Sequence, residues 1–179
     1  MFEIGPQMNY LKKSILDKHV RKIEKEVPVR FLSRKSMNER TGEKDYDGAF
    51  NFSTGIYIVN TVPNYVKICI LFHEYGHFLC YKNKCRCVQM CEKKFIGFSK
   101  DKMVWVPLCE AHACIYVLKA LYKDQLWGTF KHEMSLVMSF EKSDDSDDKD
   151  TFEKLKKLKG WKELKNAFEH LNTQREPVL

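Results

Sequence analysis

The chain has 179 residues, of which 44% are hydrophobic and 31% are charged, and its formal net charge is +7. This composition suits one compact domain, with or without a small appendage, and excludes a disordered chain or an integral membrane protein. No segment approaches the 18 consecutive apolar residues of a membrane span, and the first 13 residues lack the apolar core of a secretory signal. We therefore expect a cytoplasmic protein with no membrane partner.

The number of cysteines indicates their redox state, and the distribution of charge indicates possible partners. The seven cysteines are an odd number, and without a secretory signal they are better read as reduced thiols or metal ligands than as structural disulfides. Residues 82–102 carry seven Lys or Arg against two acids, whereas residues 141–150 carry six acids against two lysines. A basic segment can attract nucleic acid or acidic proteins, although a solvated surface is its commoner origin.

The first third of the chain predicts a helix and a small sheet. Residues 8–27 have apolar side chains near helical spacing, and residues 27–32 are typical of a strand, with Pro28 at its start or on an edge. Residues 33–47 show no apolar periodicity and are expected to form a loop. Residues 48–52 and 55–59 flank a short polar turn, which predicts an antiparallel hairpin.

The remainder of the chain predicts mainly helices. We expect helices over residues 65–80, 107–122 and 125–140, and an irregular, basic, cysteine-rich insertion over residues 81–102. The predicted fold class is α+β, with a short antiparallel sheet packed on the helix of residues 65–80 and further helices after it.

The C-terminal part suggests a boundary. Residues 141–150 are acidic and of low complexity, which is typical of a solvated linker. Residues 151–171 again have helical spacing, interrupted at Gly160, so that one kinked helix or two short helices are both compatible with the pattern. We expect a main domain over residues 1–140, a linker over residues 141–150 and a helical tail over residues 151–179.

The strongest functional signal is the sequence His-Glu-Tyr-Gly-His at residues 73–77, inside an apolar helical pattern. Residues four apart lie on the same face of a helix, so the imidazoles of His73 and His77 can reach one ion, and zinc prefers such nitrogen ligands. Glu74 lies beside this face, where its carboxylate can accept a proton from an attacking water. The pattern therefore predicts a hydrolytic zinc site.

Catalytic zinc sites use three protein ligands. This sequence excludes two known classes of site that differ in their third ligand. A metzincin would place a glycine and a histidine after the motif where Cys80 and Asn83 stand. A deformylase-like site would take a cysteine from an upstream segment resembling E-G-C-L-S, and no such segment precedes the helix; Cys69 belongs to the helix itself.

Glu110 is the best candidate for the third ligand. It lies on a later helix that is otherwise apolar, and a carboxylate there is costly unless it is paired or bound to a metal. Ala113, about one turn later, would allow the two helices to approach closely. The weaker candidates for this ligand are Glu92, Asp101 and His112, of which His112 could instead stabilise the oxyanion.

At these residues the chain resembles the gluzincin peptidases, and among them the ImmA/IrrE-like family. The likeness covers residues 48–121 and is carried by the strand of residues 56–60, the motif of residues 73–77, and the Glu-Ala-His-Ala-Cys-Ile-Tyr-Val sequence of residues 110–117. The resemblance implies a small zincin-like peptidase fold with zinc held by His73, His77 and Glu110 and Glu74 as the base.

The resemblance also implies a biological role, and the sequence departs from the family's pattern in two respects. Members of that family often cleave or regulate transcriptional repressors, which points to phage or mobile-element biology and to a protein substrate. His112 and Cys114 replace the acidic and Asn/Asp positions common in such helices. The cysteine-rich insertion between the two motifs is not expected in that family.

That insertion contains a candidate second metal site. Cys80, Cys85, Cys87 and Cys91 follow the pattern C-x4-C-x-C-x3-C, and four thiolates could bind a structural zinc tetrahedrally, with Cys109 as a substitute for one of them. The alternative is a set of reduced, partly buried cysteines without a ligand role. The lysines and arginine around them would make the loop a basic surface that could guide substrate or bind nucleic acid.

Two functions remain open on the sequence. The first is peptide hydrolysis, in which Tyr116 or His112 donates to the oxyanion and the substrate pairs with residues 55–59 as an exposed edge strand. The second is a non-catalytic zinc-containing module that binds nucleic acid or a protein through the basic loop. Glu74 favours the first, because a structural site needs no base.

Overall fold

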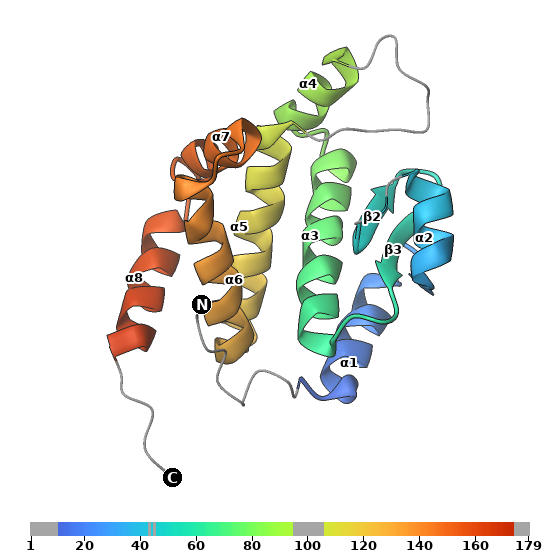
Figure 1. The fold of residues 1–179 in the computed structure, drawn as a ribbon, viewed down its shortest axis with the longest axis horizontal. Helices are drawn as coiled ribbons and strands as arrows, with labels where there is room; N and C mark the ends of the chain where they lie inside the picture. The colour runs from blue at the N-terminus through green and yellow to red at the C-terminus, as the bar shows by residue number, and fades with distance from the viewer. Residues whose placement is uncertain (1–10, 43, 45, 95–105, 174–179) are drawn as a thin grey trace.

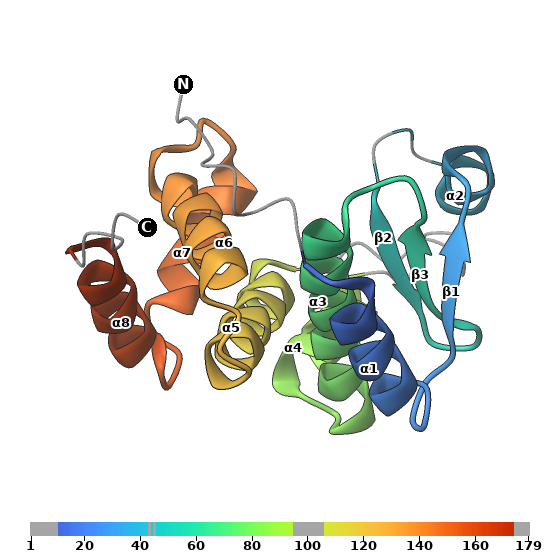
Figure 2. The ribbon, with the colours of Figure 1, turned by 90° about the horizontal axis from the view of Figure 1, so that it is seen from below.

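The computed structural model describes residues 11–42, 44, 46–94 and 106–173, with the side chains of residues 91–94 outside that description. The fold is α+β, as predicted. A three-stranded sheet lies on one side of the long helix α3, and the later helices lie on the other side (Figures 1 and 2). The helix α2 covers the outer face of the sheet (Figure 2).

The N-terminal part supplies the sheet and its two covering helices. The helix α1 spans Lys13–Ile23 and leads into the strand β1, Val29–Leu32. After α2, Arg34–Thr41, come the predicted hairpin strands β2, Gly48–Asn51, and β3, Gly55–Val59. The strand order is β1-β3-β2, with β1 parallel and β2 antiparallel to β3.

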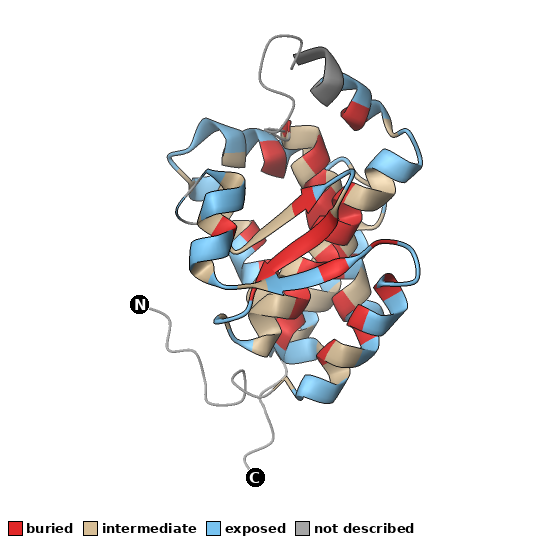
Figure 3. Cartoon of the chain, turned by 90° about the vertical axis from the view of Figure 1, so that its right-hand side faces the viewer, coloured by how far each residue is buried: buried red, intermediate tan, exposed pale blue. Residues whose placement is uncertain are grey.

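The strand β3 is central and buried, so the prediction that residues 55–59 form an edge strand was wrong. All five residues of β3 are buried, and Ile56 pairs with Val29 of β1 on one side and with Phe50 of β2 on the other (Figure 3). The hairpin with β2 is local and visible in the sequence, whereas the parallel partner β1 is separated from β3 by α2. The two edge strands of the sheet are therefore β1 and β2, and the outer edge of β2 is free, because it pairs with no other described strand.

The helix α2 replaces part of the loop predicted for residues 33–47. The side chain of Ser33 accepts a hydrogen bond from the backbone N–H of Ser36 at 3.1 Å, and Gly42 ends the helix in the left-handed region, with φ 73°. Met37 is the one side chain buried within α2, so the segment lacks an apolar stripe. The capping residues Ser33 and Gly42 were the sequence signal that could have predicted this helix.

The helices that follow agree with the predicted ones within a few residues. The helix α3 spans Asn64–Lys82, α5 spans Pro107–Lys123 and α6 spans Trp127–Ser139. The cysteine-rich segment contains a further helix, α4, Arg86–Lys94, so the prediction of an irregular segment was wrong there. The helices α3 and α5 pack side by side through the middle of the molecule (Figure 1).

The acidic segment of residues 141–150, for which we expected a linker, includes the start of a helix. The helix α7 spans Ser146–Leu155, and the carboxylate of Asp145 caps it by accepting the N–H of Asp147 at 2.7 Å. It is preceded by a 3-10 turn, Phe140–Lys142. The acidic residues are therefore typical here of a helix N-terminus, where negative charge is favourable.

The last helix of the described residues, α8, spans Trp161–Thr173 and lies in the predicted tail. Gly160 has φ 97° and separates α8 from α7, so two short helices are present rather than one kinked helix. One hydrophobic cluster contains buried residues of every helix from α1 to α8 except α2 and α4, for example Leu16 and Leu164. Among the described residues, no helix combines the length and apolar character needed to cross a membrane.

Candidate metal centre

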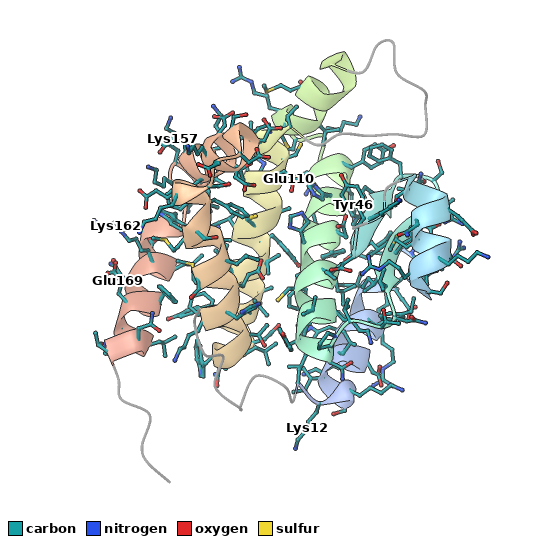
Figure 4. All side chains as sticks on the ribbon, viewed as in Figure 1. Lys12, Tyr46, Glu110, Lys157, Lys162 and Glu169 are labelled. Atoms are coloured by element: carbon teal, nitrogen blue, oxygen red, sulfur yellow. The ribbon has the colours of Figure 1, made fainter. Side chains whose placement is uncertain are left out.

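The structure brings together the three residues predicted to bind a metal. His73 and His77 lie one turn apart on α3, and Glu110 extends from the first turn of α5 toward them (Figure 4). The two Nε2 atoms are 3.1 Å apart. The Glu110 carboxylate oxygens lie 3.1 Å from His73 Nε2 and 3.5 Å from His77 Nε2.

These separations fit a single ion. Ligand atoms at about 2.0–2.1 Å from a tetrahedral zinc are about 3.3–3.4 Å from one another, so the observed 3.1–3.5 Å triangle has the right size. The three ligand atoms lie within 4.8 Å of one another and come from two packed helices. The group of His73, His77 and Glu110 could therefore hold a metal ion.

The electrostatics of the group favour one positive charge between the ligands. Burial lowers the pKa of His77 to about 3, so its imidazole is neutral, as a metal ligand must be. Burial also acts to lower the pKa of His73, but hydrogen bonds to Cys114 and Glu110 and the negative charge of Glu110 outweigh it and raise that pKa. Burial acts to raise the pKa of Glu110, whereas His73 and His77 lower it overall. A bound cation would supply the charge that these groups favour.

Close packing of α3 on α5 sets the distance between the histidines and Glu110. Gly76 lies between the two histidines, and a Cβ built on it would be 2.9 Å from the Cα of Ala113. The small residues at these two positions thus allow the backbones to approach, as Ala113 suggested in the sequence.

A methyl group at Gly76 should therefore weaken metal binding. In Gly76→Ala the backbone of α5 must move away from α3, and we expect metal affinity to fall roughly 10–100-fold, the range for residues that orient ligands. The matched control is Gly128→Ala on α6, where an added Cβ meets no atom within 4 Å. Titration of both variants against a chelating dye measures the effect, and equal affinities would contradict this role of Gly76.

Glu74 is held next to the free edge of β2. Its carboxylate is buried and accepts a backbone hydrogen bond from Phe50. Burial, with a smaller contribution from the charge of Glu110, raises its pKa to about 7, although His73 acts to lower it. A carboxylate with a pKa near neutrality is well matched to proton transfer from water.

The ladder hydrogen bonds show which backbone groups of β2 face away from β3. The N–H of Val59 donates to the carbonyl of Asp47 at 2.8 Å, so in the alternating antiparallel pattern Ala49 also points its backbone groups toward β3. The backbone groups of Gly48 and Phe50 consequently face the free edge, where Phe50 meets Glu74. A Cβ on Gly48 would clash with Ile70 and approach the Glu74 carboxylate to 3.1 Å.

A cavity of about 220 Å³ opens beside the group of ligands. His73, Glu110 and Cys114 line one part of it, and the carboxylates of Asp147 and Asp148 on α7 line another. Asp147 is exposed and Asp148 is half-buried, with its carboxylate accepting a hydrogen bond from the Ser143 hydroxyl at 2.7 Å. The cavity therefore presents negative charge to a molecule that reaches the metal-binding group.

Sequence reasoning missed two residues that surround His73. The thiol of Cys114 hydrogen-bonds to His73, and the charge of Glu133, on α6, acts on the same imidazole. Burial raises the pKa of Glu133, whose carboxylate hydrogen-bonds to Cys69. In the sequence Glu133 follows Lys131 and His132 directly, so it does not stand out as a lone carboxylate among apolar residues in the way that Glu110 does.

A second group of metal-ligand type lies at the same end of α3 and α5. It consists of Cys80, Cys85, Cys87 and His112, whose ligand atoms all lie within 4.8 Å of one another. His112 Nδ1 is 3.8 Å from Cys80 Sγ and 3.4 Å from each of Cys85 Sγ and Cys87 Sγ. These residues could hold a second metal ion.

Among the described residues, His112 joins three of the four cysteines that the sequence assigned to this site. The side chain of Cys91 lies outside the described residues, as do the side chain of Glu92 and the whole of Asp101. Cys109 is buried beside Cys87, to which it hydrogen-bonds, but it is not part of the four-residue group. All six cysteines whose side chains are described are free thiols, at positions 69, 80, 85, 87, 109 and 114.

The two candidate oxyanion donors, His112 and Tyr116, have different neighbours in the structure. The Nδ1 atom of His112 faces the thiols of the second group. The ring of Tyr116 packs on Phe72 and Tyr75, with centroid distances of 6.4 and 5.6 Å, and these two residues flank α3 away from the face that carries His73. The oxyanion role of either residue stays a prediction.

Comparisons with known proteins found no match, so functional inference rests on the two groups of residues described above. No protein-family model matches the chain, and no curated protein and no solved structure was found to be similar to it.

Proposed function

We propose that this chain is a zinc-dependent peptidase that binds zinc through His73, His77 and Glu110 and uses Glu74 as its general base. The observation that carries the proposal is the meeting of the two imidazoles and the Glu110 carboxylate at 3.1–3.5 Å, with a buried carboxylate, Glu74, on the adjacent helix position. A purely structural zinc site would have no use for the Glu74 carboxylate, because it needs no general base.

The chemistry of the site follows from the position of Glu74. Zinc bound there would act as a Lewis acid that acidifies water and polarises a carbonyl. Glu74 accepts the proton of the attacking water and returns it to the leaving amine, because its pKa is close to neutrality. The N–H of Phe50 holds the carboxylate in place for both transfers. His73 is oriented by Cys114, and His77 by its burial between α3 and α5.

The free edge of β2 is the surface on which we expect the substrate backbone to lie. The backbone groups of Gly48 and Phe50 at this edge can pair with an extended peptide, which is the common mode of strand addition. The same edge borders Glu74, so a peptide paired with β2 would pass the metal-binding group. This edge replaces the one that the sequence assigned to β3.

The cavity between α5 and α7 suggests which side chains the substrate carries. Asp147 and Asp148 line it, and a lysine or arginine side chain would place its positive charge beside these two carboxylates. The helix α7 thus turns an acidic segment into one wall of the proposed substrate site. We expect cleavage next to a basic residue.

Cleavage of a broad peptide library tests the proposal. The protein should cleave with zinc bound, lose cleavage after chelation, and recover it when zinc is restored, with Lys or Arg enriched at one position beside the cut. Cleavage that survives complete removal of the metal would contradict the proposal. If the zinc-loaded protein cleaves nothing, the non-catalytic module is the better account, and binding of the zinc-loaded chain to nucleic acid should then be measured.

A further inference from the structure

We infer that Cys80, Cys85, Cys87 and His112 form a second, structural zinc site that fastens α4 to the helix pair α3 and α5. Zinc sites with three cysteines and one histidine are closed, four-coordinate and structural. The inference concerns a site whose ligands are all distinct from those of the proposed catalytic group.

The distances from His112 to the three thiols agree with one tetrahedral ion. With bonds of about 2.3 Å to sulfur and about 2.0–2.1 Å to nitrogen, sulfur and nitrogen ligands are separated by about 3.5–3.6 Å. The three observed distances from His112 Nδ1 to the thiols are 3.4, 3.4 and 3.8 Å. Cys85 Sγ and Cys87 Sγ are 3.0 Å apart, closer than the two sulfurs would stand around an ion and well beyond a disulfide bond of about 2.05 Å.

The donor set selects zinc among common ions. Three thiolates with one imidazole suit a borderline-soft ion, and the hard cations magnesium and calcium prefer oxygen ligands. Cys87 is fully buried and Cys80 and Cys85 are half-buried, so the site is largely closed to solvent. Four protein ligands would complete the tetrahedral coordination and leave no open position for a substrate or a water, which points to a structural role.

The segment that carries two of these ligands has little apolar packing of its own. Cys85 and Cys87 belong to the turn before α4 and to its first residues, and α4 projects beyond the ends of α3 and α5 (Figure 1). Around them lies a small core separate from the main one, formed by Cys87, Val88, Val106 and Cys109. A metal ion bound by ligands from α3, α5 and the α4 segment would hold α4 against the other two helices, which so small a core cannot do alone.

The two metal groups share their helices. Cys80 follows His77 by three residues on α3, and His112 follows Glu110 by two residues on α5, so both groups join the same pair of helices within less than one turn of each other along each helix. The second ion would thus also restrain the distance between α3 and α5 near Glu110. Its loss should weaken metal binding at the first group without removing a ligand from it.

Titration of the reduced protein with cobalt(II) tests the second site. Only this group contains thiol ligands, so its occupation gives a thiolate-to-cobalt charge-transfer band in the near ultraviolet, whereas the first group gives none. We expect two cobalt ions per chain, with the band saturating at one equivalent. The band should persist in Glu110→Ala, which separates the outcome from any failure of the proposed peptidase site.

Variants then assign the ligands. His112→Ala and the double variant Cys85→Ser with Cys87→Ser should each lose the band, whereas Cys91→Ser, the matched control in the same segment, should keep it. Loss of the band in Cys91→Ser with retention in His112→Ala would overturn the assignment of His112. Absence of the band in the reduced wild type, where no folding defect intervenes, would overturn the site altogether.

Discussion

Replacing Glu74 with glutamine should lower the rate of peptide cleavage about 10²–10⁴-fold, the usual cost of losing a general base, while zinc content stays at the wild-type level. Glutamine keeps the shape of the side chain and can still contact the N–H of Phe50, but it cannot accept a proton. Rates on one peptide from the library, measured beside the zinc content of each sample, give the comparison. Glu39→Gln, an exposed change on α2, is the matched control.

The same substitution makes a prediction about stability and pH. Burial raises the pKa of Glu74 to about 7, above its unfolded value, so folding favours the protonated form and the ionised carboxylate is destabilising as pH rises through that range. Metal-free Glu74→Gln should therefore unfold at a temperature at least as high as the wild type at neutral pH. For the zinc-loaded wild type, cleavage should decline toward acidic pH as Glu74 is protonated, and this decline should be absent from the residual activity of Glu74→Gln.

A mutant that loses cleavage together with zinc would mean that Glu74 acts through metal binding. A mutant that retains full cleavage and full zinc would show that another group is the base. In either case the assignment of Glu74 fails, although the ligand set of His73, His77 and Glu110 would still stand.

Replacing Glu110 with alanine should produce the second large effect, a loss of zinc affinity of roughly a hundredfold or more, because it removes the one anionic ligand and exceeds the 10–100-fold cost of changes around a site. Its carboxylate contacts both histidine Nε2 atoms, at 3.1 and 3.5 Å, from the opposite helix. Without it the two imidazoles of α3 are left as ligands. Competition with a chelating dye measures the affinity.

Glu169→Ala is the matched control for Glu110→Ala. Glu169 is an exposed acid on α8 that pairs with Lys165 and lies far from Glu110 (Figure 4). Its replacement should leave zinc affinity unchanged. Wild-type affinity in Glu110→Ala would remove Glu110 from the ligand set and reopen the search among Glu133 and the carboxylates of α7.

The sequence predicted the parts of the fold and site that depend on local spacing. The helical repeat placed His73 and His77 on one face, and the cost of a carboxylate in an apolar helix singled out Glu110, which the structure brings beside them. The hairpin of β2 and β3 was equally local. The histidine pair and Glu110 could each be singled out within one helix, and the hairpin within one pair of neighbouring strands.

Features that depend on distant segments could not be predicted in the same way. The parallel pairing of β1 with β3 joins segments on either side of α2 and makes β2, not β3, the free edge beside Glu74. His112 was expected near the first group, but its neighbours are thiols from α3 and α4. The periodicity of α5 fixes the face of His112 but does not reveal which helix lies opposite.

The most direct test of the central claim is X-ray diffraction from crystals of the zinc-loaded protein, with data collected on both sides of the zinc absorption edge. We predict an anomalous peak about 2.0–2.1 Å from His73 Nε2, His77 Nε2 and a carboxylate oxygen of Glu110, with the carboxylate of Glu74 close by but not bound to the ion. An absence of anomalous signal at these three residues, with zinc present elsewhere in the same crystal, would contradict the account.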